Sequence, residues 1–265
     1  MVSGFQVFID AIFNPIFGWM LSLPPLVSIL ILAFILGLIS TLLQKYLTDQ
    51  AKMRRLREDT KKYQEQMKKA SKEGDQEKVL KLQQKMMPMQ LDMMKESFKP
   101  LLVSLIPFLL VFFWLSNHFA FHQITPDTPF TVSASFEEGV AGSVTLRSEP
   151  NLLIENPTQQ ITDGTAKWIV QGEQGVYNLT LSFPEGSVIK PASRPVIITT
   201  DRLYEAPEMP NPNGHKFVRS FDVGNEKLVP IPGLNLFGWH PGWIFYYIIF
   251  SIPISLLLKK WLKVV

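Results

Sequence analysis

Three long stretches without a charged residue constrain this chain more than any other feature of its sequence. Residues 11–44, 100–126 and 228–258 contain no Lys, Arg, Asp or Glu. Their densest apolar runs cover residues 26–43, 101–121 and 243–258. As helices these runs would span roughly 24 to 32 Å, close to the hydrocarbon core of a bilayer at about 30 Å. The chain is therefore predicted to cross a membrane three times.

The first apolar run is predicted to be a retained span and not a cleaved signal. It follows 25 residues that have no basic region, and a lysine-rich flank comes after it in place of a small-residue cleavage site. The chain has no cysteine, which excludes disulfides and thiolate metal sites.

The charges between the spans predict the orientation. Residues 44–99 hold 15 Lys/Arg and 9 Asp/Glu, whereas residues 122–240 hold 8 and 13. The tail after Leu258 adds three lysines and no acid. By the positive-inside rule, residues 44–99 and the C-terminus lie in the cytoplasm, and the N-terminus and residues 122–240 lie outside.

The basic segment has two heptad-like runs. The first steps through Leu56, Thr60, Tyr63, Met67 and Ala70, and the second through Val79, Leu82, Met86, Met89 and Met93. Between the runs, Gly74 suits a helix end and Asp75 suits the N-cap of the next helix. The pattern predicts an antiparallel coiled-coil hairpin that rises from the membrane.

Five of the ten methionines lie close together at the end of this segment: Met86, Met87, Met89, Met93 and Met94. Pro88 and Pro100 are expected to break the helix, leaving residues 89–98 as a separate amphipathic piece near the inner membrane surface. Because methionine is flexible and polarizable, such a cluster could contact many apolar clients. The alternative is that these are ordinary residues of the hairpin seam.

Residues 122–240 are predicted to form an all-β, sandwich-like domain. Short alternating runs broken by Gly and Pro give six candidate strands, and helical periodicity is absent. The strands are expected over residues 130–136, 143–147, 166–170, 176–183, 196–200 and 216–221. In the fourth, Asn178 begins an Asn-Leu-Thr glycosylation sequon on the face opposite Tyr177 and Leu179.

Six polar residues fall in the cytoplasmic half of the predicted spans: Ser40, Thr41, Gln44, Ser104, Ser251 and Ser255. Polar side chains in hydrocarbon need partners or water, so they could line a hydrophilic groove open to the cytoplasm and to lipid. The alternative is that they bond to carbonyls of their own helices and allow close helix packing.

Catalytic signatures are absent from the sequence. There is no nucleophile elbow, phosphate loop, zinc-binding helix or dinucleotide fingerprint, and the four histidines lack metal-ligand spacing. The basic segment mixes in acids and has no aromatic stacking pattern, which argues against specific nucleic-acid binding. We expect no enzyme activity, no metal and no cofactor.

The order of these features resembles the YidC/Oxa superfamily, and most closely its archaeal YidC-like branch, related to the third subunit of the ER membrane complex. The resemblance rests on the methionine-rich stretch 86–95, on Pro230-Ile231-Pro232, and on Tyr247, Ser251 and the Leu-Leu-Leu-Lys-Lys ending at Lys260. It implies a membrane protein insertase whose cytoplasm-facing groove receives a client's polar flanks. Unlike the bacterial members, this chain has no Lys or Arg within a span, so attraction of acidic segments would depend on Lys45, Lys99 or neutral polar groups.

The expected layout is an α-helical membrane protein with three transmembrane helices, a cytoplasmic helical hairpin and an inserted extracytoplasmic β domain. Its segments are an N-terminal interfacial helix at 1–25, spans at 26–44, 100–121 and 241–258, the hairpin and methionine-rich helix at 45–99, the β domain at 122–240 and a basic tail at 259–265. The predicted function is insertion of nascent membrane proteins from the plasma membrane's cytoplasmic side, with a ribosome or translocon and the bilayer as further partners. The alternatives are a membrane-anchored binding module and a channel or transporter subunit.

Overall fold

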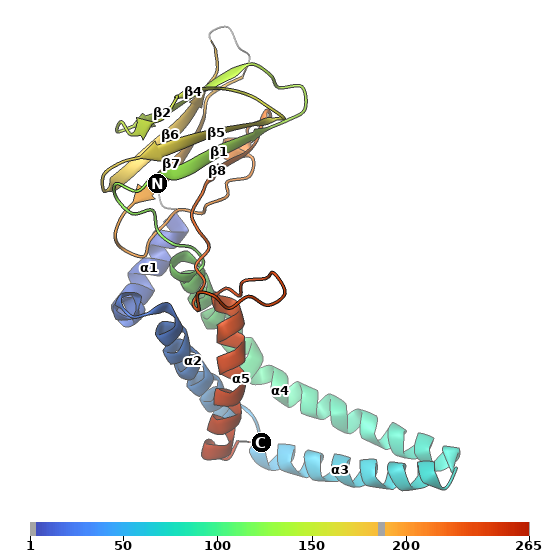
Figure 1. Cartoon of the computed structure of the whole chain (residues 1–265). Helices are drawn as coiled ribbons and strands as arrows, with labels where there is room; N and C mark the ends of the chain where they lie inside the picture. Colours follow the sequence, from blue (N-terminus) through green and yellow to red (C-terminus); the bar gives the residue numbers. More distant parts are fainter. Residues whose placement is uncertain (1–3, 185–188, 265) are drawn as a thin grey trace. The chain divides into compact units, whose positions relative to one another are not determined.

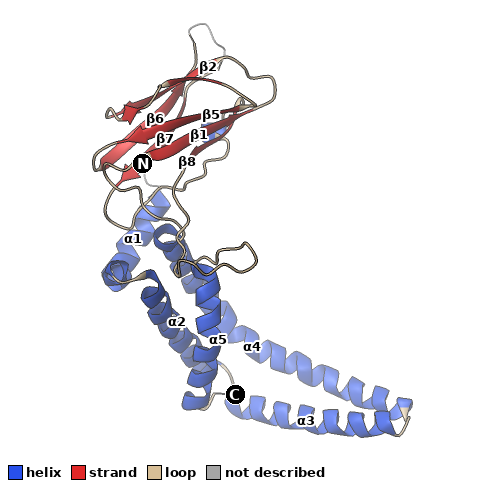
Figure 2. Ribbon diagram, viewed as in Figure 1, coloured by secondary structure: helices blue, strands red, loops and turns tan. Residues whose placement is uncertain are grey.

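The computed structural model describes residues 4–184 and 189–264 and divides into two compact units. The first unit comprises Met1–Pro25 and Phe113–Trp243, and the second comprises Leu26–Phe112 and Ile244–Val265. Figure 1 follows the chain through both units, and Figure 2 shows that strands are confined to the first. The second unit is helical.

Long apolar helices account for the predicted spans. α2 covers Pro25–Leu47, α4 covers Gln76–Phe119 and α5 covers Trp243–Leu262. All three are long and apolar enough to cross a membrane. By the same measure Gly4–Ser22, made of α1 (Gly4–Phe17) and the 3-10 helix η1 (Gly18–Ser22), is a fourth candidate, although the sequence prediction gave this segment an interfacial position.

α1 crosses the end of α4 within the first unit. Phe5 stacks edge-on against Phe113, and twelve residues later Phe17 packs on Trp114. Asn14 between them accepts a hydrogen bond from the Trp114 indole at 2.8 Å. These contacts hold α1 against the C-terminal end of α4.

The predicted hairpin is present in the second unit (Figure 1). α3 (Gln50–Lys72) is N-capped by Asp49 and α4 by Asp75, whose carboxylates accept the N–H groups of Lys52 and Lys78 at 2.9 Å. Gly74 has a φ of 73°, the left-handed conformation expected at a helix end. All ten heptad positions are buried or half-buried, in agreement with the predicted seam.

The prediction that Pro88 and Pro100 break the return helix is wrong. α4 continues through Pro88, Pro100 and Pro107 without interruption. A proline inside a helix removes one hydrogen bond to the carbonyl four residues earlier, and for Pro88 that carbonyl belongs to the exposed Gln84, where water can replace the bond. The methionines are therefore part of one helix that is continuous with the predicted second span.

The all-β domain consists of two antiparallel four-stranded sheets, ordered β3-β5-β1-β8 and β4-β2-β6-β7. The strands are β1 Phe130–Phe136, β2 Ser143–Glu149, β3 Leu153–Ile154, β4 Thr158–Gln160, β5 Thr165–Gln171, β6 Gly175–Ser182, β7 Ala192–Ile198 and β8 Val218–Val223. The alternating inward residues of both sheets form one hydrophobic core, which includes Val132, Trp168, Leu179, Ile198 and Phe221.

The six predicted strands are all present, with ends displaced by a few residues at most places. β3 and β4 were missed because two or three residues are too short for a periodic pattern. In β6, Tyr177 and Leu179 are buried and Asn178 is exposed, as predicted. Glycosylation of Asn178 stays a prediction.

Candidate functional site

A cavity of about 370 Å³ lies between the C-terminal part of α2 and the middle of α4, inside the second unit. α2 contributes Ser40 and Gln44, which are one helical turn apart. α4 contributes the remaining lining residues, which recur at helical spacing over four turns: Ser97, Pro100, Leu101, Ser104, Leu105, Phe108, Leu109 and Phe112.

The cavity is polar at one end and apolar at the other. Ser97 and Ser104, with Pro100 and Leu101 between them on α4, join Ser40 and Gln44 at the end that adjoins the hairpin. Beyond Ser104 the α4 lining is entirely apolar through Phe112. Ser40 and Ser97 are exposed and Gln44 is half-buried, so the polar end is open to the surroundings of the unit. Such a cavity offers both hydrogen-bonding groups and apolar surface to the same ligand.

The six predicted groove residues therefore fall into two groups. Ser40, Gln44 and Ser104 are brought together around the cavity. Thr41 is buried and donates to the carbonyl of Gly37 at 2.7 Å, and Ser251 donates to Ile248 at 2.9 Å. Neither of these, nor Ser255, lines the cavity. Ser104 also donates within its own helix, to Leu101 at 3.1 Å.

Gly37 explains how α5 is held against α2. A β-carbon at Gly37 would lie 3.3 Å from Ile254 and 3.5 Å from Leu258, both on α5. The missing side chain lets the two helices approach closely, as small residues do in membrane bundles. This contact fixes which face of α5 is turned toward α2.

An ion-pair cluster lies where the hairpin joins the cavity. The buried carboxylate of Glu96 receives Lys99 at 2.7 Å and Lys52 of α3 at 3.3 Å. The hydrogen bond from Lys99, followed by that from Lys52, lowers the pKa of Glu96. Of the two lysines that the sequence analysis considered for attracting acidic segments, Lys99 is paired here, and no ion pair is found for Lys45 among the residues that the structure describes.

The five methionines divide between two faces of α4. Met86 is buried and Met89 and Met93 are half-buried on the hairpin seam, as in the alternative reading. Met87 and Met94 are 58% and 49% exposed. With Leu91 and Phe98 these two form a stripe, here called the outer stripe, whose steps of four, three and four residues place it on one helix face.

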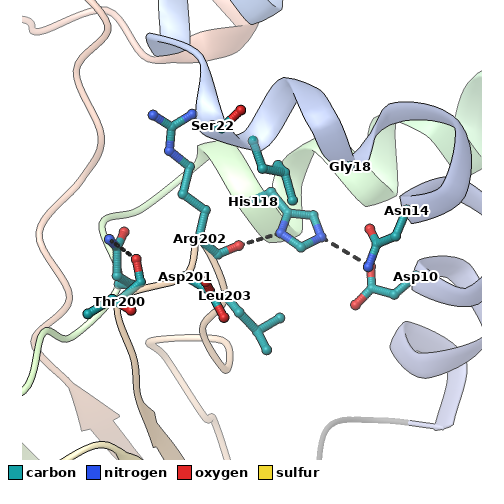
Figure 3. A pocket seen from close by; sticks show the side chains of 11 residues that line it. Asp10, Asn14, Gly18, Ser22, His118, Thr200, Asp201, Arg202 and Leu203 are labelled. Carbon is teal, nitrogen blue, oxygen red and sulfur yellow. Dashed lines mark hydrogen bonds and ion pairs between the residues drawn. The ribbon is translucent and has the colours of Figure 1, made fainter.

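A second cavity, of about 630 Å³, lies in the first unit between α1, η1, the end of α4 and the loop after β7. Figure 3 shows His118 at its wall, directed at Asp10 and at the backbone carbonyl of Arg202. Nε2 of His118 lies 3.1 Å from the Asp10 carboxylate.

Sequence reasoning missed Ser97, Glu96 and the His118 contact. Ser97 could have been found, because it shares a helix face with Leu101 and Ser104 at steps of four and three. Glu96 could not have been found, because no sequence pattern distinguishes it from the other acidic residues of the hairpin. In the described ranges 4–184 and 189–264, no group of three or more His, Asp or Glu side chains could hold a metal ion.

Comparison with known proteins gives one match. A family model described as "Integral membrane protein EMC3/TMCO1-like" matches residues 10–145, more than half of the 265 residues. The matched range runs from α1 through the hairpin and α4 into β2. It ends before α5, so the resemblance of Pro230-Ile231-Pro232 and of the chain's end lies outside it. No curated protein and no solved structure matches the chain.

Proposed function

This chain belongs to the EMC3/TMCO1-like family of integral membrane proteins, which is linked to membrane protein insertion, and we propose that it inserts hydrophobic segments of nascent proteins into the membrane. The α2–α4 cavity receives a client's polar flank, and the hydrophobic segment passes along the apolar part of α4 into lipid. The clients are nascent membrane proteins, delivered by a ribosome or a translocon.

The observation that carries this proposal is the polarity gradient of the cavity. Moving a polar group through hydrocarbon without a partner costs several kcal/mol, roughly 2 to 7 for one amide or hydroxyl. Ser40, Gln44 and Ser104 offer hydrogen bonds at one end, and the lining from Leu105 to Phe112 is apolar. A client that lies along this gradient keeps polar partners while its apolar part leaves water, which lowers the barrier to insertion.

The outer stripe supports the same function. Met87, Leu91, Met94 and Phe98 present apolar surface on the part of α4 that leads to the cavity. Because α4 is unbroken, a client bound to this stripe needs only to slide along one helix to reach Leu101 and Ser104. The seam methionines Met86, Met89 and Met93 hold the hairpin together, and we assign client contact to Met87 and Met94.

The proposed topology has three spans, with the N-terminus and β domain outside and the hairpin and C-terminus in the cytoplasm. An interfacial position for α1 is supported by its exposed apolar residues, which recur at helical spacing: Phe5, Phe8, Ile12 and Ile16. We place the protein in the plasma membrane and in the archaeal YidC-like branch. Asn178 is then a glycosylation site on the outer side.

The insertion activity can be measured in proteoliposomes. Vesicles with this protein should insert a client with a short translocated tail more efficiently than empty vesicles. A variant with Ser40, Gln44 and Ser104 replaced by Leu, Leu and Ala should lose most of this gain, because its cavity no longer offers polar partners. The matched control is Thr41→Val with Ser251→Ala, which removes two groups of the same kind outside the cavity. Equal insertion by vesicles with and without the protein would contradict the proposal.

Insertion in this form needs no covalent chemistry, so we propose no enzyme activity, metal or cofactor. The assay also separates the alternatives. A membrane-anchored binding module would leave client insertion unchanged, and a channel subunit would raise ion permeability whether or not a client is present.

A further inference from the structure

The loop that precedes α5, drawn as a trace in Figure 1, contains a narrow hairpin at residues 236–239. Leu236 and Trp239 exchange two backbone hydrogen bonds of 2.9 and 3.0 Å, with Phe237 and Gly238 between them. Both tip residues have positive φ, 54° and 88°, as a type I′ turn requires. The Phe237 side chain is fully exposed.

Phe237 is an unfavourable choice for this turn. Asn or Gly is preferred where φ is positive, and a bulky side chain there is strained. The turn therefore carries two unfavourable terms at Phe237. The residue has a strained positive φ, and its apolar ring is exposed to water. A contact made by the ring outside the chain would offset these costs.

The chain itself restricts where this contact can be. Only five residues lie between Phe237 and Trp243, where α5 begins, and the fully extended chain from one to the other reaches about 20 Å. α5 is a candidate membrane span that begins with Trp243, Tyr246 and Tyr247 close together, a composition typical of the membrane–water boundary. The tip therefore stays within about 20 Å of the start of α5, whatever conformation the loop takes.

The chemistry of the tip fits lipid. Residues 228–242 contain no Lys, Arg, Asp or Glu, and the hairpin adds the half-exposed Trp239 to Phe237. Most of its backbone N–H groups are bonded within the loop: Leu236 and Trp239 pair with each other, and the N–H of Gly238 donates to the Asn235 side chain at 2.6 Å. Backbone groups that enter a bilayer need such internal partners, whereas groups in water do not.

We propose that Leu236–Trp239 is a lipid-inserting finger, whose Phe237 and Trp239 side chains enter the leaflet at the start of α5. In the topology proposed above this is the extracytoplasmic leaflet. The finger would hold the connection between the β domain and α5 at the bilayer surface. The proposal does not depend on insertase activity.

The chain has no cysteine, so a single introduced cysteine can be labelled uniquely. A nitroxide on Phe237→Cys would be measured in lipid nanodiscs with one protein copy each, using molecular oxygen as the apolar relaxant and a nickel chelate as the polar one. Leu153→Cys on β3, which is 67% exposed, serves as the water-exposed control. We expect the oxygen-to-nickel accessibility ratio to be several-fold higher at position 237 than at 153.

Two results would overturn the proposal. Equal ratios at 237 and 153 would place the tip in water, and shielding of the 237 label from both relaxants would mean that protein covers it. A second measurement keeps the test valid if a label at position 237 disturbs the turn. The nitroxide is placed on Ile231→Cys instead, and two proteins are compared, one with Phe237 intact and one with Phe237→Asn. Since Asn retains the turn but not the lipid contact, the ratio at 231 should fall with Phe237→Asn, and an unchanged ratio would contradict insertion.

Discussion

Glu96 on α4 accepts a hydrogen bond from Lys52 on α3 at 3.3 Å, across the base of the hairpin. The Glu96 carboxylate is buried and also receives Lys99, so two lysines from different helices share it. The cluster holds the hairpin base closed next to the cavity between α2 and α4.

Replacing Glu96 by Gln should loosen this base, because two ammonium groups lose their charged acceptor. The distance between spin labels on α3 and α4 near the cluster, measured by double electron–electron resonance, should broaden toward longer values. Glu77→Gln is the matched control, since Glu77 pairs with Lys81 on the same helix and both side chains are mostly exposed. Identical distributions for Glu96→Gln and the unsubstituted protein would show that the cluster does not hold the base.

The same measurement should depend on pH with a defined sign. The pKa of Glu96 is lowered in the folded hairpin, so the carboxylate contributes stability above its ordinary pKa. That contribution should be lost as the pH falls through the lowered pKa. The label distances in the unsubstituted protein should therefore broaden in acid, and those in Glu96→Gln should change less.

Gly37→Leu should destabilise the helical unit, because the new side chain would collide with Ile254 and Leu258 of α5. Overpacking of this kind costs about 1 to 3 kcal/mol. The free energy of unfolding in mixed micelles tests this, with the exposed Ile39→Leu as control. A loss no larger than that of Ile39→Leu would mean that α2 and α5 do not pack at this position.

His118→Ala should release α1. The substitution removes the ring that contacts both the Asp10 carboxylate and the Arg202 carbonyl, and an unmade buried hydrogen bond costs about 1 to 3 kcal/mol. Backbone amides of α1 should exchange with deuterium faster, whereas His240→Ala, in an exposed loop, should leave them unchanged. Unchanged exchange after His118→Ala would mean that the other contacts, from Phe5, Asn14 and Phe17 to the end of α4, suffice to anchor α1.

Periodic features of the fold could be predicted from the sequence, and features that depend on packing could not. The heptad steps located the hairpin seam, and alternation in β6 identified Tyr177 as buried and Asn178 as exposed. Pro88 was misread, because a proline can stay within a helix when the carbonyl that it leaves unpaired faces water. The direction in which Ser251 points could not be predicted either, since it depends on how closely α5 approaches Gly37.

The central claim, that clients pass through the cavity between α2 and α4, is tested most directly by crosslinking from two neighbouring positions of α4. A photo-reactive amino acid would replace Ser104, which lines the cavity, or Ile106, which lies two residues away, is 67% exposed and does not line it. Ribosome-bound nascent chains of a short-tailed membrane protein would then be presented to vesicles that contain each variant. Strong crosslinks to the nascent chain from position 104 and weak ones from 106 are the predicted result. Equal yields from the two positions, or none from 104, would contradict the account.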